Sequence, residues 1–108
     1  LFEKETFKQT ELYPEIENNM MSTSFSHIFQ GGYSSGYYSY KWAEVLDADA
    51  FALFKETGIF NPDTAQKFYK LLSSGGTVEP MKLYEEFRGQ KPNVDSLLKR
   101  AGLSVSQN

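Results

Sequence analysis

Histidine, tyrosine and glycine, which together suit the binding of a polar ligand, gather in one short stretch of this sequence. Residues 26–40 read SHIFQGGYSSGYYSY and contain the single histidine of the chain, His27. The same stretch holds three of the eight glycines and four of the seven tyrosines: Gly31, Gly32, Gly36, Tyr33, Tyr37, Tyr38 and Tyr40. A tyrosine hydroxyl donates a hydrogen bond from a stiff apolar stem, and glycine lets the backbone adopt positive φ and approach a ligand closely. We therefore predict a glycine-rich binding loop.

Each of these residues also has a purely structural interpretation. His27 follows Phe25 and precedes Ile28, so it could be a core histidine with one satisfied hydrogen bond. Tyr37 and Tyr40 are three positions apart and would share one face of a helix as ordinary core aromatics. Residues 31–36 also resemble a phosphate-binding loop, but they lack the Lys-Ser/Thr ending that a P-loop requires.

Composition limits the classes of partner. The chain has 108 residues, of which 40% are hydrophobic and 23% charged, which is typical of a globular domain or part of one. A net charge of −3 argues against nucleic acid or an anionic membrane surface as partners. No apolar run approaches the ~20 residues that span a bilayer. The lack of cysteine excludes disulfides and thiolate metal sites, and it favours a reducing, cytoplasmic location.

Helix signals dominate the chain, so we predict an all-α fold. Residues 37–56 contain neither Pro nor Gly and form the longest helical candidate, which Gly58 follows at the C′ position. Three shorter helices are expected over residues 62–72, 80–88 and 94–101, after Asn61-Pro62, at Pro80 and after Asn93. By organisation we expect a mixed segment at 1–24, a helical body at 25–103 and a frayed tail at 104–108.

The long helix predicts that further protein surrounds it. Its apolar residues lie on nearly every side, which is typical of a helix buried in a large protein. Glu44, Asp47 and Asp49 are embedded among them and would need charge partners, for which the chain offers few candidates. Because the first residue is Leu1 rather than Met, we expect an N-terminal portion of the protein to precede this chain.

Several motifs resemble those of one known family. The run HIFQGGY at 27–33, then GYYSY at 36–40 and WAEVLDADAF at 42–51, resembles the C-terminal region of the thimet oligopeptidase, oligopeptidase A and peptidyl-dipeptidase family of zinc metallopeptidases. Shorter matches follow in the same order: SGG at 74–76, EPM at 79–81, FRG at 87–89 and DSLL at 95–98. The resemblance covers roughly residues 25–103. One extra residue between His27 and Gly31, relative to thimet oligopeptidase, favours the peptidyl-dipeptidase branch.

The resemblance implies a zincin-like, two-lobed helical metallopeptidase of several hundred residues. Such enzymes hold zinc with two histidines of a His-Glu-x-x-His helix and with a glutamate of a following helix. A catalytic zinc needs about three protein ligands, whereas this chain has one histidine and lacks that motif. We therefore expect a C-terminal fragment that binds no zinc and is inactive alone, and whose partners are the zinc-bearing remainder of its parent chain and short peptide substrates.

The resemblance also implies catalytic roles for two residues. Tyr40 would donate its hydroxyl to the tetrahedral oxyanion that forms as water attacks the scissile carbonyl. A preorganised donor of this kind is worth ~3–4 kcal/mol in transition-state stabilisation. His27 would hydrogen-bond the substrate backbone near the scissile bond.

The remaining implied roles concern substrate binding. Tyr33 would close over the peptide, Tyr37 would add a contact, and Gly31 and Gly32 would let the loop change shape. The expected activity is hydrolysis of short peptides with release of C-terminal dipeptides. The alternative is a freestanding, non-catalytic helical module whose loop binds a peptide.

Overall fold

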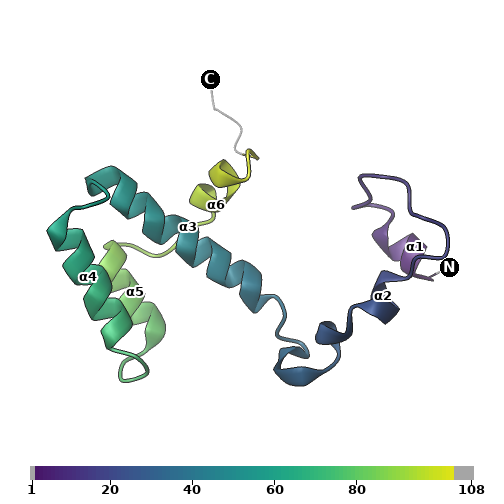
Figure 1. Cartoon of the computed structure of the whole chain (residues 1–108), viewed down its shortest axis with the longest axis horizontal. Helices are drawn as coiled ribbons and strands as arrows, with labels where there is room; N and C mark the ends of the chain where they lie inside the picture. Colours follow the sequence, from purple (N-terminus) through teal and green to yellow (C-terminus); the bar gives the residue numbers. More distant parts are fainter. Residues whose placement is uncertain (1, 104–108) are drawn as a thin grey trace. The chain divides into compact units, whose positions relative to one another are not determined.

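The structure, a computed structural model, describes residues 2–103 and contains helices but no strand within them (Figure 1). This confirms the predicted all-α fold. The expected frayed tail at 104–108 lies outside the described residues. The chain divides into two compact units, residues 1–39 and residues 40–108, which we call the loop unit and the helical unit. The domain boundary expected near residue 24 stays a prediction.

The loop unit contains short helical elements joined by irregular chain. These are α1 (Phe2–Phe7), α2 (Met21–Ser24) and two 3₁₀ turns, η1 (Ser26–Ile28) and η2 (Gly31–Tyr33). The Glu3 carboxylate joins α1 to α2, because it accepts hydrogen bonds from the Ser22 backbone N–H (2.9 Å) and from the Ser22 hydroxyl (2.7 Å). These bonds, that of the hydroxyl above all, lower the pKa of Glu3.

The helical unit contains α3 (Ser39–Thr57), α4 (Pro62–Ser73), α5 (Pro80–Arg88) and α6 (Asp95–Arg100). Capping residues, prolines and glycines of the kinds used in the sequence analysis explain where most of these helices begin and end. The Asn61 side chain accepts the backbone N–H groups of the first turn of α4, and Glu79 does the same for α5. Gly58 (φ +105°) and Gly89 (φ +81°) end α3 and α5 in backbone conformations that favour glycine.

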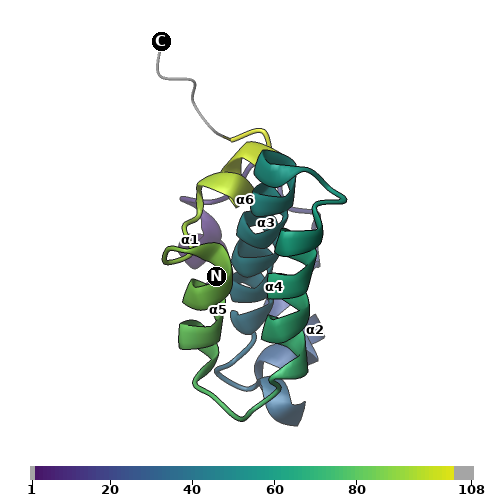
Figure 2. The same cartoon turned by 90° about the vertical axis from the view of Figure 1, so that its left-hand side faces the viewer.

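Apolar packing among α3, α4 and α5 forms the core of the helical unit. The α4 and α5 helices lie side by side, with α3 alongside them (Figure 2). The Phe68 ring of α4 meets the Phe54 ring of α3 edge to face at 5.6 Å and contacts the tilted Phe87 ring of α5 at 5.4 Å, measured between ring centroids. Ala48 and Leu83 are buried with Phe87. Each helix therefore buries one apolar face against the other two.

The acidic residues of α3 contradict one expectation from the sequence. The three acidic residues that the sequence singles out each have a partner within this chain: Glu44 pairs with Lys41 (3.0 Å), Asp47 with Arg100 (2.6 Å) and Asp49 with Arg88 (3.3 Å). The prediction that this chain offers few charge partners is therefore wrong. Large apolar side chains on more than one side of α3 are nevertheless about half exposed: Tyr40, Trp42 and Phe51.

Candidate functional site

Three of the predicted site residues come together in the loop unit. The His27 ring lies 5.5 Å from the Tyr33 ring and 6.4 Å from the Tyr37 ring, and the two tyrosine rings are 6.3 Å apart, all between centroids. Phe25 supports the group, because its ring meets that of Tyr37 edge to face at 4.6 Å and 84°. We call His27, Tyr33 and Tyr37 the ring cluster. It gathers residues that are up to ten positions apart in the sequence.

The backbone of the loop explains how the ring cluster forms. The Phe29 and Gln30 N–H groups both donate to the Ser26 carbonyl (2.9 and 3.0 Å), which closes a tight turn that contains His27. Gly31 then adopts φ +66° and reverses the chain, so that Tyr33 returns toward His27. A second turn, in which the Gly36 N–H donates to the Tyr33 carbonyl (2.9 Å), brings Tyr37 back to the same place.

The ring cluster is accessible. His27 and Tyr33 are exposed and Tyr37 is partly buried, so His27 does not belong to a core formed by the described residues. Gly31 and Gly32 are exposed beside them. The cluster offers an imidazole and two phenol hydroxyls, which can donate and accept hydrogen bonds, on aromatic surfaces that can pack against a side chain. This combination suits a polar, uncharged group such as a peptide backbone.

Tyr37 and Tyr40 do not share a helix face, contrary to one interpretation of their spacing. The α3 helix begins at Ser39, so Tyr37 lies in the turn before it, where its ring joins the cluster. Tyr40 lies in the first turn of α3, in the helical unit, and its side chain is 47% exposed. The 19-residue helix fixes the backbone from which the Tyr40 side chain projects.

The residues of this chain do not fit a zinc site. The sequence has one histidine and no cysteine, and among residues 2–103 no three His, Asp or Glu side chains gather closely enough to hold a metal ion. Several acidic side chains of the helical unit, Asp47, Asp49 and Glu56 among them, pair with arginines instead. Across the same residues, none of the helices is long and apolar enough to cross a bilayer.

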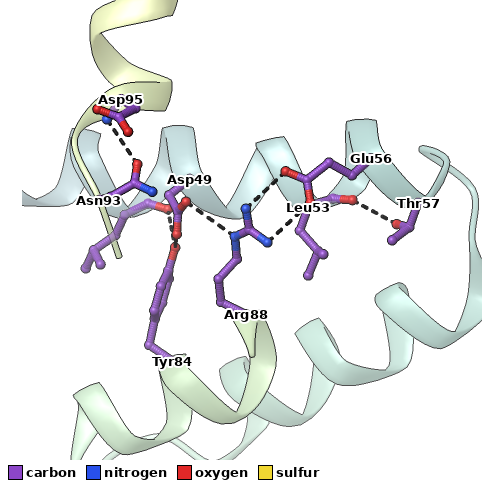
Figure 3. Close-up of polar contacts among 9 residues, drawn as sticks. Asp49, Leu53, Glu56, Thr57, Tyr84, Arg88, Asn93 and Asp95 are labelled. Carbon is purple, nitrogen blue, oxygen red and sulfur yellow. Dashed lines mark hydrogen bonds and ion pairs between the residues drawn. The ribbon is translucent and has the colours of Figure 1, made fainter. Parts of the chain in front are cut away.

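Sequence reasoning missed a polar network inside the helical unit (Figure 3). Asp49 of α3 is fully buried, and it accepts hydrogen bonds from the Tyr84 hydroxyl (2.8 Å) and from Arg88 Nε (3.3 Å). The same Tyr84 hydroxyl also lies 3.1 Å from the Leu46 carbonyl. The sequence indicates that Asp49 needs a charge partner, but nothing in it singles out Tyr84 or Arg88. The available signal was an aspartate within the apolar run of α3, which requires buried donors.

Burial in this network changes the acidity of Tyr84. Its pKa is raised above the ordinary value, first because burial disfavours the phenolate and then because the phenol donates to the Asp49 carboxylate. Tyr84 therefore remains a protonated donor to Asp49 well above neutral pH. Within the described residues, each buried side-chain nitrogen or oxygen has a hydrogen-bond partner, so the network is fully satisfied.

Comparison with known proteins gives concordant matches. The profile of Peptidase family M3 matches residues 3–103. Oligopeptidase A of Haemophilus influenzae is 57% identical over 81 residues, which are 74% of this chain and 12% of that protein. Oligopeptidase A of Salmonella typhimurium is 47% identical over 97 residues, or 89% of this chain and 14% of that protein. Dipeptidyl carboxypeptidase of Salmonella typhimurium is 35% identical over 91 residues, or 83% of this chain and 13% of that protein.

These identities correct the expected branch. Identity to the two oligopeptidases A exceeds identity to the dipeptidyl carboxypeptidase, so the prediction that the chain is nearest to the peptidyl-dipeptidases is wrong. The single extra residue between His27 and Gly31 was a weak discriminator, because loops accept insertions readily.

The match extends along nearly the whole of this chain but along only a small part of each relative. The chain spans 12% to 14% of the length of these three proteins. The family match itself includes both the loop unit and the helical unit. The chain belongs to Peptidase family M3.

Proposed function

We propose that this chain is a segment of a longer peptidase that hydrolyses oligopeptides, and that it contributes residues that bind the substrate and stabilise the transition state. Membership of Peptidase family M3 supports the reaction class, and the name oligopeptidase A of the more similar relatives supports the substrate class. The small share of each relative that the chain spans supports its being a segment. The cytoplasm remains the proposed location, supported by the lack of cysteine.

The ring cluster is the observation that carries the proposal. Two tight turns bring His27, Tyr33 and Tyr37 within 6.4 Å of one another and leave His27 and Tyr33 exposed. A peptide backbone presents donors and acceptors at short intervals, which the hydrogen-bonding groups of phenol and imidazole side chains can match. Gly31 and Gly32 add a stretch of backbone without side chains, along which an extended peptide can lie.

Tyr40 is the proposed donor to the oxyanion. When water attacks a peptide carbonyl, negative charge develops on the carbonyl oxygen, and a neutral hydroxyl already aimed at that position stabilises it. Tyr40 lies in the first turn of α3, so the helix fixes its backbone before substrate arrives. His27 is proposed to hold the substrate backbone near the bond that is cut.

We also propose that the metal used by the full-length protein is zinc, bound by residues outside these 108. The resemblance to zinc metallopeptidases supports this proposal, as does the misfit between zinc and the donors present here. Release of C-terminal dipeptides is no longer proposed, because it depended on the peptidyl-dipeptidase branch.

The test replaces Tyr40 by phenylalanine in the full-length protein and measures the hydrolysis of a fluorogenic oligopeptide. Loss of one oxyanion donor lowers kcat by about 100- to 1,000-fold in measured cases, and we expect KM to stay within about threefold. Tyr38→Phe is the matched control, because Tyr38 is two residues away, is 74% exposed and has no proposed role.

The two variants separate the possible outcomes. A large fall in kcat with Tyr40→Phe and an unchanged kcat with Tyr38→Phe would support the proposed role. Equal kcat for wild type and Tyr40→Phe would remove Tyr40 from the oxyanion site. If the full-length protein bound the oligopeptide but did not hydrolyse it, a non-catalytic peptide-binding module would be the better description.

A further inference from the structure

One arginine joins two turns of the helix that carries Tyr40. Arg88, the last residue of α5, has a side chain that is only 10% exposed. Its Nε donates to Asp49 Oδ1 (3.3 Å), while Nη1 and Nη2 donate to the two carboxylate oxygens of Glu56 (3.3 and 3.1 Å). Figure 3 shows the guanidinium between these two acidic side chains, both of which come from α3.

The spacing of the two carboxylates gives this contact its geometric effect. Asp49 and Glu56 are seven residues apart, which is close to two turns of an α-helix, so they lie on one face and roughly 10 Å apart along the axis. The guanidinium is planar and donates hydrogen bonds to both carboxylates. If α3 slid or rotated against α5, at least one of these hydrogen bonds would be lost. The Tyr84 hydroxyl adds a third fixed point, because it donates to Asp49 one turn before Arg88 along α5.

The apolar contacts between the same helices are less restrictive. Ala48, Leu83 and Phe87 are buried in the helical unit, and apolar burial is not directional. Hydrogen bonds to a buried carboxylate are directional and are costly to leave unmade. A buried ion pair adds little net stability compared with apolar residues of the same volume. The presence of Arg88 is therefore better explained if it selects one arrangement of α3 against α5.

We propose that Arg88 is a positioning residue: by holding Asp49 and Glu56 it fixes the register of α3 and thereby the position of the Tyr40 hydroxyl. Tyr40 lies on the same continuous helix, nine residues before Asp49, or roughly 13 Å along the axis. A small rotation or slide of α3 at Asp49 is transmitted to its first turn. The inference rests on the proposed role of Tyr40 as the oxyanion donor.

The test is a double-mutant cycle in the full-length protein, with kcat and KM measured for one fluorogenic oligopeptide. Arg88→Lys keeps the positive charge but cannot reach both carboxylates, and we expect kcat to fall about 10- to 100-fold, since misplacement by about 1 Å has effects of that size. In the Tyr40→Phe background the same substitution should change kcat by less than about threefold, because the group that it positions is already absent.

Arg100→Lys is the matched control. Arg100 also pairs with an aspartate of α3, at 2.6 Å from Asp47, but both side chains are well exposed. Its substitution should leave kcat within about threefold of wild type, because exposed ion pairs contribute little. If the far-ultraviolet circular dichroism shows that Arg88→Lys is not a folded helical protein, the cycle is repeated with Glu56→Gln in place of Arg88→Lys. The Glu56→Gln substitution weakens only the exposed end of the network, and its fall in kcat should again disappear in the Tyr40→Phe background.

The possible results separate this inference from the proposed function. If Arg88→Lys lowered kcat by the same factor in the wild-type and Tyr40→Phe backgrounds, the positioning role of Arg88 would be overturned. Tyr40 would still be the proposed oxyanion donor. An unchanged kcat in Arg88→Lys and Glu56→Gln, beside a large effect of Tyr40→Phe, would also overturn the positioning role. An unchanged kcat in Tyr40→Phe itself would overturn the proposed function, and the inference with it.

Discussion

Replacing Gly89 by alanine isolates a backbone effect at the end of α5. Gly89 adopts φ +81°, and its N–H donates to the Glu85 carbonyl (2.8 Å), so it ends the helix in the left-handed conformation. A Cβ atom added at this position would meet no heavy atom within 4 Å. The substitution therefore introduces no clash, and its whole effect comes from placing an L-residue at positive φ.

The expected magnitude follows from two opposing terms. The left-handed conformation costs an alanine about 1–2 kcal/mol relative to glycine. The unfolded chain loses freedom when glycine becomes alanine, which offsets about 0.4–1 kcal/mol of that cost. The net loss in free energy of unfolding therefore lies between about 0 and 1.6 kcal/mol, with a central value of about 0.8 kcal/mol. With a denaturant slope of about 1–2 kcal/mol per molar urea, the unfolding midpoint should fall by roughly 0.5 M.

The assay is urea unfolding of the 108-residue chain, followed by circular dichroism at 222 nm. Gly76→Ala is the control, because Gly76 lies outside the positive-φ region and its added Cβ also meets nothing within 4 Å. Gly76→Ala only reduces the conformational freedom of the unfolded chain, so its unfolding midpoint should stay constant or rise. Gly89→Asn should lose less than Gly89→Ala, because asparagine tolerates the left-handed conformation better. Equal midpoint shifts in Gly89→Ala and Gly76→Ala would refute the reasoning.

Two further predictions concern the core of the helical unit. Phe87 is 3% exposed and Phe60 is 96% exposed, so Phe87→Ala should lower the free energy of unfolding by about 3–5 kcal/mol and Phe60→Ala by less than about 0.5 kcal/mol in urea titrations. Similar losses in the two variants would contradict the assigned core. Because the pKa of Tyr84 is raised in the folded chain, its contribution to stability is complete below pH ~10 and is lost as pH rises further, when only the unfolded chain ionises. Unfolding midpoints of wild type should therefore fall more steeply above pH ~10 than those of Tyr84→Phe, and parallel curves would show that this phenol is not protected.

The helices that could be predicted well are those whose ends depend on local chemistry. Asn61 followed by Pro62 begins α4, and Gly89 ends α5, as the sequence predicts. These signals work because a cap satisfies backbone groups within three or four residues, without help from the rest of the fold. The short turns η1 and η2 carry no comparable signal and were not predicted.

The start of α3 shows where local signals fail. Tyr37 was assigned to the helix because neither Pro nor Gly separates it from Tyr40. In the structure Ser35 adopts φ +57° and the Tyr37 ring packs against Phe25, which is twelve residues earlier. The packing of a large aromatic ring outweighs the small helix propensity of a single residue. The same packing that shortens α3 assembles the ring cluster, so this error and the candidate site have one cause.

The partners of Asp49 lay beyond sequence reasoning for a related reason. Tyr84 and Arg88 are 35 and 39 residues away, and no short-range pattern reports that α5 will turn these side chains toward α3. Sequence does show that Asp49 stands in an apolar run, and burial of an unpaired charge is costly enough to require partners somewhere. It cannot tell whether those partners belong to this chain or to another segment, and the expectation of few partners here failed at that step.

Charge is distributed in this chain in a way that suits the proposed division of roles. The charges of the buried network, on Asp49, Arg88 and Glu56, meet one another between α3 and α5. The ring cluster contains phenol and imidazole groups and no carboxylate, ammonium or guanidinium. A carboxylate beside the developing oxyanion would repel it, and an unpaired arginine would bind acidic peptides in preference to others. In the proposed division of roles, the phenol and imidazole groups of the ring cluster would recognise the peptide backbone, which all substrates share. The paired charges of Asp49, Arg88 and Glu56 would set the position of the helix that carries Tyr40.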